Sequence, residues 1–479
     1  MKNRICINIS FLILIFSFSI FASPPDTLWT RVYGTNLNEY GRSVLEVSNG
    51  YLISSNWRNY IFLLRTDENG DTLWARGFDA RLGMIGDMTI QKTQDGGCII
   101  AGTRNYDFCL IKVDSLGNLL WTKIINVIWS DEAYSISSTF DNGFVITGFA
   151  SYRIGVVKIN QNGDILWTRT YGNPYLATYY PYSIHQTPDG GFIITGRVDT
   201  SQVGGSIKDL FIFKISSEGD SLWFKNLKEF SASLSAPDAG YSVAFTSDCG
   251  YIITGYQYSY GRGRDICLIK LDSSGNIIWN KRFGGSGHDE GYAVRETSDG
   301  GYIIVGKKQM FFNKGYNLWV IKTNYSGDTL WTKTIGGNGD EVGYCIQETS
   351  DGNYIVTGYT TSYGAGGADL YLIKLSGIVN KEEKENYNLS RERTEIETII
   401  FKDKLKIDFS SKIKGKMDLT IYNVFGACLY KKCISLNSST LILNDKNLAK
   451  IPKGFYFLKI FSNKKEIGRS KLIKIGGIE

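Results

Sequence analysis

The chain has 479 residues, a formal charge of +6, 53 glycines against 7 prolines, and 14% aromatic residues, a composition typical of an all-β protein with many turns. Residues 23–377 hold 30 Lys and Arg against 35 Asp and Glu, whereas residues 378–479 hold 21 against 12. The mildly acidic main region argues against a nucleic-acid-binding surface, and the scattered basic charge of the tail is typical of a solvated face.

The first 23 residues predict a secretory signal peptide. Lys2 and Arg4 form a basic start, residues 9–21 are apolar, and the small residues Ala22 and Ser23 follow. The alternative, a membrane anchor, would need an apolar run of about 20 residues. No later stretch is apolar enough to cross a bilayer. We therefore expect an exported protein with no membrane span once the signal is removed.

Residues 24–377 consist of seven repeats, each with four short runs of β-branched and aromatic residues separated by Gly, Asp, Asn and Ser. Such runs predict strands joined by tight turns. Six repeats carry an Asp-Gly turn or a close relative, and every repeat has a tryptophan at one equivalent position, most often after leucine. The tryptophans are Trp29, Trp74, Trp121, Trp167, Trp223, Trp279 and Trp331. A repeat of this length with four strands predicts one blade of a β-propeller.

The ends of the repeat region predict how the ring closes. The region starts on the strand at residues 27–33, which resembles the outer strand of a blade, and its last repeat stops after the third strand, at residues 372–375. If the first strand completes the last blade, the ring closes and no free sheet edge remains. A flat solenoid, the alternative, usually needs atypical capping repeats. We predict a seven-bladed propeller over residues 24–377 and expect it to be monomeric.

The pattern LIK-x-D-x-x-G-x-x-x-W resembles the blade motif of quinoprotein propellers. The resemblance implies that the seven tryptophans lie on outer strands and dock between blades. Those dehydrogenases are similar in using a vicinal cysteine pair and a calcium-bound quinone, but the repeats here contain no adjacent cysteines. The S-x-D-G-G turn also looks like a sialidase Asp-box, but the aromatic-rich ending of that box is missing.

The cysteines argue against a disulfide-stapled scaffold. Seven remain after signal removal, an odd number with no regular spacing: Cys98, Cys109, Cys249, Cys267, Cys345, Cys428 and Cys433. Cys109 and Cys267 occupy equivalent places in two repeats where other repeats carry apolar residues, which favours small buried side chains. A bridge between Cys428 and Cys433 across a hairpin remains open.

The C-terminal region divides into a charged linker, residues 378–394, and a strand-rich segment, residues 395–479. Two motifs of this segment, around Tyr422 and Gly426 and around Gly454 and Tyr456, resemble the C-terminal sorting domain of the Bacteroidetes-type (type IX) secretion system. The usual Asn-Pro-Phe entry is absent. The resemblance implies a small β-sandwich that is read by the outer-membrane translocon and removed, sometimes with attachment of the protein to surface lipopolysaccharide. The alternative, an ordinary Ig-like module, has the same fold.

Candidate binding residues come from the loops. The connections that vary in length between repeats all lie on one face of the predicted disc, the variable-loop face, where a propeller would recognise a partner. Acidic residues recur there before the innermost strand of five repeats: Glu39, Asp131, Glu132, Asp238, Asp289, Glu290, Asp340 and Glu341. They form either a cation or polar-ligand site, with calcium as its cofactor, or acceptors for backbone amides at strand entry. We favour the second interpretation and expect no other cofactor.

No catalytic motif stands out, because the only two histidines, His185 and His288, lie in different repeats and no nucleophile or phosphate-loop pattern occurs. We therefore expect a secreted or surface-attached, non-enzymatic propeller that binds an extracellular protein or glycan. The alternative is an extracellular polysaccharide lyase or hydrolase, which would need His, Tyr, Arg and carboxylates converging at the channel mouth. A third hypothesis is a structural surface component with no discrete site.

Overall fold

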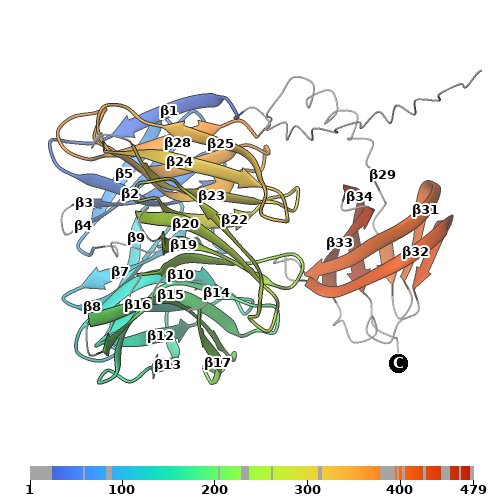
Figure 1. Cartoon of the computed structure of the whole chain (residues 1–479), viewed down its shortest axis with the longest axis horizontal. Helices are drawn as coiled ribbons and strands as arrows, with labels where there is room; N and C mark the ends of the chain where they lie inside the picture. Colours follow the sequence, from blue (N-terminus) through green and yellow to red (C-terminus); the bar gives the residue numbers. More distant parts are fainter. Residues whose placement is uncertain are drawn as a thin grey trace, which may run out of the picture.

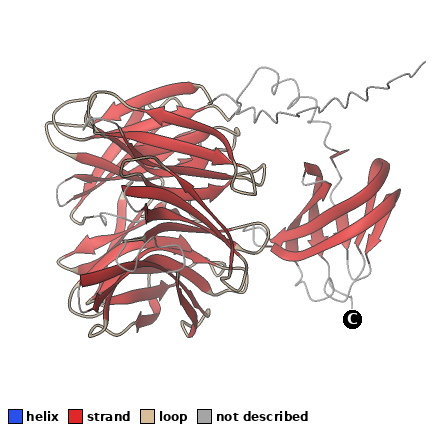
Figure 2. Cartoon of the chain, in the orientation of Figure 1, coloured by secondary structure: helices blue, strands red, loops and turns tan. Residues whose placement is uncertain are grey.

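The computed structural model describes residues 24–57, 60–81, 89–202, 205–227, 237–259, 263–310, 315–377, 394–395, 399–401, 405–423, 428–443, 454–462 and 465–474. Within these ranges every regular element is a strand (Figures 1 and 2). No described helix is long and apolar enough to span a membrane. The predicted signal peptide and nearly all of the predicted linker lie outside the described residues.

Seven four-stranded antiparallel sheets form the blades of a propeller, as the repeats predicted. We number them along the chain and give each from its innermost strand outward. Blade 1 is β2 (Glu39–Val47), β3 (Gly50–Trp57), β4 (Tyr60–Thr66) and β5 (Thr72–Phe78); blade 2 is β6 (Ile90–Lys92), β7 (Cys98–Arg104), β8 (Asp107–Val113) and β9 (Leu119–Ile125); blade 3 is β10 (Asp131–Ser138), β11 (Phe144–Ala150), β12 (Arg153–Ile159) and β13 (Ile165–Tyr171). Blade 4 is β14 (Ala177–Gln186), β15 (Phe192–Gln202), β16 (Gly205–Ile215) and β17 (Ser221–Asn226); blade 5 is β18 (Ala239–Phe245), β19 (Tyr251–Ser259), β20 (Gly263–Leu271) and β21 (Ile277–Phe283). Blade 6 is β22 (Glu290–Glu296), β23 (Tyr302–Gln309), β24 (Tyr316–Thr323) and β25 (Thr329–Ile335); blade 7 is β26 (Glu341–Glu348), β27 (Tyr354–Thr360), β28 (Asp369–Leu375) and β1 (Thr27–Tyr33).

The blades alternate two kinds of connection, which define two faces of the disc. Short turns join the first strand to the second and the third to the fourth, and we call the face that carries them the short-turn face. The variable-loop face carries the other connections. The middle strands are buried on both sides, as in β20, where Ile266–Leu271 is fully enclosed. Such strands have continuous apolar runs because neighbouring blades cover both their surfaces.

The ring closes as the two ends of the repeat region predicted. β1 pairs antiparallel with β28, with Thr30 opposite Ile373 and Tyr33 opposite Leu370. The Ser376 amide donates to the Asp26 carbonyl at 2.9 Å. Strands from the two ends of the propeller therefore share blade 7 and leave no open sheet edge inside the ring.

The tryptophans dock between blades, as the resemblance implied. Each of the first six packs its ring on the glycine of the third-to-fourth-strand turn of the next blade. Gly117, for example, has φ +80°, and a Cβ there would lie 2.6 Å from the Trp74 ring. Only glycine meets both requirements. Trp331 is 3% exposed and packs in the core that blades 6 and 7 share.

A buried lysine holds the first short turn in six blades. Its ammonium group reaches an aspartate of the turn, with closest distances of 2.8–3.2 Å. The pairs are Lys112–Asp95, Lys158–Asp141, Lys214–Asp189, Lys270–Asp248, Lys322–Asp299 and Lys374–Asp351. Lys270 also donates to Thr246 Oγ1 at 3.0 Å and to the Leu271 carbonyl at 3.1 Å. In blade 1, Arg65 donates to the backbone carbonyls of Ser48 and Thr66 instead.

The buried cysteines fit the sequence interpretation. Cys109 and Cys267 are fully buried, and both are free thiols. Burial raises the pKa of Cys109 to about 11. These side chains therefore act as small apolar residues between blades.

The C-terminal segment forms an all-β module of six strands: β29 (Thr394–Glu395), β30 (Ile399–Phe401), β31 (Leu405–Asn423), β32 (Cys428–Leu443), β33 (Gly454–Ser462) and β34 (Lys465–Lys474). The register of β31 and β32 breaks between Asp408 and Ile413. Residues on both sides of the break, such as Leu405 and Leu419, share one core, so the strands wrap around a common interior in the manner of a small sandwich.

The structure pairs the two sorting-domain motifs directly. Tyr422 of β31 lies opposite Phe457 of β33, and Asn423 lies opposite Tyr456. Gly454 begins β33, and Gly426 lies outside the described residues. The two motifs thus lie on neighbouring strands of one sheet.

Several strands extend beyond the apolar runs that predicted them. β20 begins at Gly263, ahead of the apolar residues that start at Ile266, and β22 begins at Glu290, ahead of Tyr292. The extra residues pair through their backbones, as in Ser259 opposite Gly263. Ladder hydrogen bonds do not require apolar side chains, so composition underestimates strand length here.

We expect the two partners of the buried ion pair to differ in their effect on stability. Asp248→Asn leaves the Lys270 ammonium, whose side chain is 3% exposed, without its counter-charge, and should lower the free energy of unfolding by about 2 kcal/mol. Lys270→Met removes the buried charge and leaves a carboxylate that is 44% exposed, so about 1 kcal/mol is expected. Urea unfolding of both single variants and the double variant measures this.

The double variant should cost less than the sum of the single variants, because the two side chains interact directly. Equal or reversed costs for the single variants would contradict the view that the buried ammonium group controls the stability of this turn.

Candidate functional site

The predicted acidic residues lie on the variable-loop face, at the entry to the innermost strands. Five of them occupy one equivalent position and are between 0% and 6% exposed: Glu39, Asp131, Asp238, Asp289 and Glu341. Each belongs to a different blade. The structure therefore places them around the ring, one per blade, rather than gathering them into one cluster.

These five carboxylates accept hydrogen bonds from backbone amides of nearby loops. Asp131 accepts from the amide of Val127 at 2.6 Å, and Glu341 accepts from that of Gly337 at 2.7 Å. Glu39 and Asp289 bind the amide four residues earlier in the same way, and Asp238 accepts from the Tyr258 amide at 2.9 Å. All five thus organise the loops of their own chain.

The remaining three acids have other partners. Glu132 pairs with Arg81 at 2.7 Å, and Asp340 accepts from the Tyr316 amide at 2.8 Å. Glu290, 4% exposed, pairs with Arg264 at 2.5 Å and Lys307 at 3.3 Å and accepts from the Tyr292 hydroxyl at 2.8 Å. Burial works to raise the pKa of Glu290, but Lys307, Arg264 and Tyr292 outweigh it and lower the pKa. Glu290 is therefore an ionised centre of a compact charged group.

Burial raises the pKa of the three aspartates at the strand-entry position, Asp131, Asp238 and Asp289. It raises the pKa of Asp238 to about 6, although the Tyr258 amide and Arg282 oppose the shift. Among the described residues, no three His, Cys, Asp or Glu side chains converge in a way that could hold a metal ion.

A ring of tyrosines lies at the centre of the propeller. In six blades, a register shift between the first and second strands leaves one residue of the innermost strand out of the ladder. The equivalent residue of blade 2 lies outside the described residues. In blades 3 to 7 the residue outside the ladder is Tyr134, Tyr182, Tyr241, Tyr292 and Tyr344, and in blade 1 it is Arg42. Consecutive rings lie 5.0–5.6 Å apart, and Arg42 stacks on Tyr344 at 4.3 Å. These aromatic contacts link the innermost strands of blades 3 to 7 and blade 1.

We call the contact between two neighbouring blades a joint. On the short-turn face, at three joints, a glutamate of one blade binds the first short turn of the preceding blade, and we call this contact a clamp. Glu296 of blade 6 accepts from both the amide and the hydroxyl of Ser247 in blade 5, each at 2.7 Å. Glu348 binds Ser298 and Glu46 binds Ser350 in the same bidentate way, at 2.6–2.8 Å. The joints from blade 5 through blades 6 and 7 to blade 1 are therefore fastened.

The other four joints lack this clamp. Register identifies the equivalent residues, because each lies opposite the first residue of the second strand; they are Lys92, Ser138, Gln186 and Phe245. Gln186 keeps one bond, from the Phe140 amide at 2.6 Å. Ser138 is too short to repeat the contact that Glu296 makes with the preceding turn.

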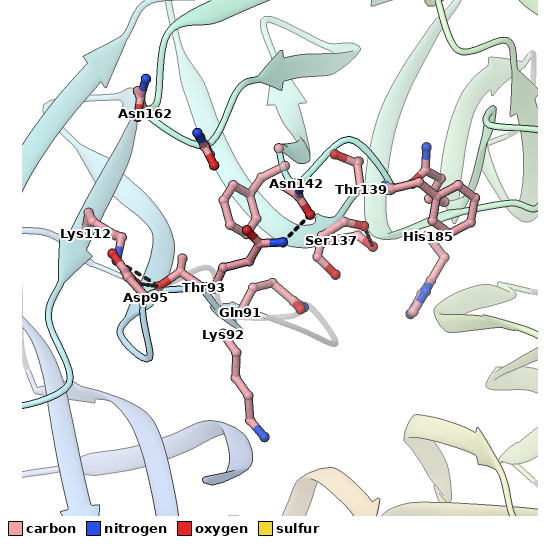
Figure 3. A pocket seen from close by; sticks show the side chains of 17 residues that line it. Gln91, Lys92, Thr93, Asp95, Lys112, Ser137, Thr139, Asn142, Asn162 and His185 are labelled. Atoms are coloured by element: carbon pink, nitrogen blue, oxygen red, sulfur yellow. Dashed lines mark hydrogen bonds and ion pairs between the residues drawn. The ribbon is translucent and has the colours of Figure 1, made fainter. Parts of the chain in front are cut away.

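A groove of about 830 Å³ opens at these unclamped joints, across blades 2, 3 and 4 (Figure 3). We call it the open-joint groove. Its lining residues are Gln91, Lys92, Thr93, Gln94, Asp95, Lys112, Ser137, Ser138, Thr139, Phe140, Asn142, Gly143, Phe144, Gln161, Asn162, His185 and Gln186. The volume is in the range of small-molecule sites. None of the predicted acidic residues contributes to it.

Hydroxyl and amide groups dominate the lining of the open-joint groove. Gln94 donates to Asn142 Oδ1 at 2.5 Å across the joint between blades 2 and 3. Asp95, the one lining carboxylate among the described residues, is held by Lys112 at 2.8 Å. Partial burial works to raise its pKa, but Lys112, Thr93 and the Gly97 amide lower it to about 2. Asp95 thus stays ionised, and its charge is neutralised by Lys112.

The sequence contained a signal for this groove that composition alone did not reveal. Glutamate occupies the end of the innermost strand in blades 1, 6 and 7 and is missing there in blades 2 to 5. Aligning the repeats at this one position would have divided the short-turn face into two halves. Only the structure shows that the glutamate clamps a neighbouring blade, and hence that its absence opens a groove.

Comparison with known families identifies the C-terminal module. Residues 401–475 match the secretion system C-terminal sorting domain. This confirms the assignment made from the two motifs and indicates export by type IX secretion to the cell surface or the extracellular space. No curated protein matches the chain.

Several solved structures are similar to this chain over about three quarters of its length, at low sequence identity. A Dyadobacter fermentans protein of unknown function is 10% identical, with 73% of this chain and 99% of that chain covered and a TM-score of 0.42. The polysaccharide lyase Uly1 is 10% identical, with 72% and 92% covered and a TM-score of 0.46. YCF48, solved with a D1 peptide, is 11% identical, with 75% and 99% covered and a TM-score of 0.45. At this similarity, their functions do not transfer to this chain.

We expect Asp238→Asn to stabilise the protein at alkaline pH. The folded-state pKa of about 6 lies above the ordinary value of 3.8, so ionisation of Asp238 costs the folded state stability above pH 6, and this cost disappears toward pH 4. The amide keeps an acceptor for Tyr258 without the charge. The free energy of unfolding should rise by about 2 kcal/mol at pH 8 and should not change at pH 4.

Urea unfolding at the two pH values measures this difference. Loss of stability at pH 8 would mean instead that a cation or another partner holds the ionised carboxylate.

Proposed function

We propose that this protein is a non-enzymatic binding propeller, exported by type IX secretion, that holds an oligosaccharide in the open-joint groove. The observation that carries the proposal is a groove of about 830 Å³ lined mainly by amide and hydroxyl side chains. Sugar hydroxyls both donate and accept hydrogen bonds, and Asn, Gln, Ser and Thr side chains match them in both respects. Phe140, half-buried at the groove, adds an apolar surface for a sugar ring.

The internal ion pair and hydrogen bonds of the lining side chains support binding rather than catalysis. Cleavage of a glycosidic bond by hydrolysis uses two carboxyl groups, one as acid and one as base or nucleophile. The described lining supplies one carboxylate, Asp95, and Lys112 holds it ionised. The Ser137 hydroxyl donates to the Ser138 carbonyl at 3.3 Å. These groups can position a ligand, and the described lining offers no pair of carboxyl groups for hydrolysis.

The groove is better supported as the binding site than the variable-loop face that the sequence suggested. On that face the five strand-entry carboxylates bind backbone amides of nearby loops, and Glu290 is engaged with Arg264, Lys307 and Tyr292. A ligand there would have to replace internal bonds. In the open-joint groove, by contrast, Ser138, Gln161 and Asn162 are exposed and accessible to a ligand.

Ser138→Glu tests the proposal by closing the groove. A glutamate there should accept from the Gln94 amide as Glu296 accepts from Ser247, so stability should hold or rise by about 1 kcal/mol. Binding of the full chain to an oligosaccharide array, followed by calorimetry on the strongest array sugar, should fall at least tenfold. Chromatography of that sugar after prolonged incubation should show no cleavage products.

Gln347→Glu is the matched control, because it adds the same charge to an innermost strand of blade 7 that does not line the groove. It should bind like the parent. Unchanged binding by Ser138→Glu, or no binding to any oligosaccharide by the folded parent, would refute the proposed site. Cleavage products would refute the non-enzymatic assignment.

A further inference from the structure

We propose that the open-joint groove selects an acidic saccharide, with Lys92 pairing with its carboxylate or sulfate group. This inference rests on the proposed function and adds the charge of the ligand to it. Lys92 is exposed, lies at the end of β6 and lines the groove. Its ammonium group is the lysine charge of the described lining that the Asp95 carboxylate does not neutralise.

Lys92 occupies a position where the chain uses the opposite charge elsewhere. Its equivalents in blades 1, 6 and 7 are Glu46, Glu296 and Glu348, which clamp a serine of the preceding blade. A lysine cannot accept hydrogen bonds from that amide and hydroxyl. The preceding turn, in blade 1, is held by Arg65 instead. Charge reversal at this position therefore releases Lys92 from the structural role of its equivalents.

No carboxylate described in the groove neutralises Lys92. Asp95 is paired with Lys112, whose ammonium group lies 2.8 Å from both of its carboxylate oxygens. Glu46, on the innermost strand of blade 1, has both oxygens engaged by Ser350 at 2.8 Å. With the internal pair cancelled, the described lining keeps one positive charge from Lys92. An anionic ligand group would supply the missing partner.

Lys92 and His185 are placed where they could contact a ligand that extends along the groove. Figure 3 shows Lys92 and His185 extending to the same side, away from the Asp95–Lys112 pair. Between them lie the polar side chains of Gln91 and Ser137. A saccharide whose hydroxyls contact the amide and hydroxyl lining could therefore present an acidic substituent to Lys92 at one end. Uronate and sulfated sugars both carry that chemistry.

Matched pairs of oligosaccharides test the charge preference. The full chain is titrated by calorimetry with a galacturonate hexasaccharide and its methyl ester, and with a chondroitin sulfate hexasaccharide and its desulfated form. In any pair that binds, the more acidic member should bind at least threefold more tightly at 50 mM salt. The advantage should shrink at 500 mM salt, because an exposed ion pair is screened.

Lys92→Gln should remove that advantage by weakening the more acidic member about three- to fivefold, while binding of the other member stays within error. Lys431→Gln is the control for overall charge, because the Lys431 side chain on β32 is exposed and lies outside the groove. It should leave both affinities unchanged.

The outcomes separate the two proposals. Equal binding of both members of a pair, or a preference that survives Lys92→Gln, refutes the charge assignment and leaves oligosaccharide binding intact. Failure of all four sugars, together with a negative oligosaccharide array, refutes the proposed function itself. If Ser138→Glu abolishes binding of both members of a pair but Lys92→Gln affects only the more acidic one, both proposals stand.

Discussion

The ion pair of a buried lysine with a turn aspartate, present in six of the seven blades, is the interaction on which the rest of this structure depends. Removing an ammonium group from water costs several kcal/mol unless charge and hydrogen bonds replace the solvent. Lys270 recovers this cost from Asp248, Thr246 and the Leu271 carbonyl, and the same arrangement recurs around the ring. Because the lysine lies on the third strand and the aspartate on the first turn, each pair fixes the short turn against the body of its blade.

With the turns fixed, the contacts between blades decide where the surface is open. Glutamates fasten three joints by binding a serine of the preceding turn, and shorter or different side chains leave four joints without that clamp. The open-joint groove lies where Ser138 stands in place of a clamp glutamate. The groove thus arises from the local loss of a structural contact, with the blade fold itself unchanged.

The two faces of the disc differ in whether their polar side chains have partners within the protein or remain accessible to a ligand. On the variable-loop face, carboxylates such as Asp131 and Glu341 organise nearby loops, and burial rather than charge pairing governs the pKa of Asp238. On the short-turn face, hydroxyl and amide groups remain accessible in the open-joint groove. The tyrosine ring lies between these faces. The number of acidic residues on a face is therefore a poor guide to binding unless their internal partners are known.

The sequence by itself determined the strands, the seven blades, the closure of the ring by β1 and the sorting domain, because these depend on local periodicity and on repeated spacing. Only the tertiary structure decided which polar side chains have hydrogen-bond or ion-pair partners within the protein. Ser138 and Gln94 belong to different blades, so no local pattern shows that they border one groove. The acidic positions were readable from the sequence, but their backbone partners depend on how each loop folds. Repeats specify architecture through what they share, whereas the groove follows from a difference between repeats that matters only once neighbouring blades are in contact.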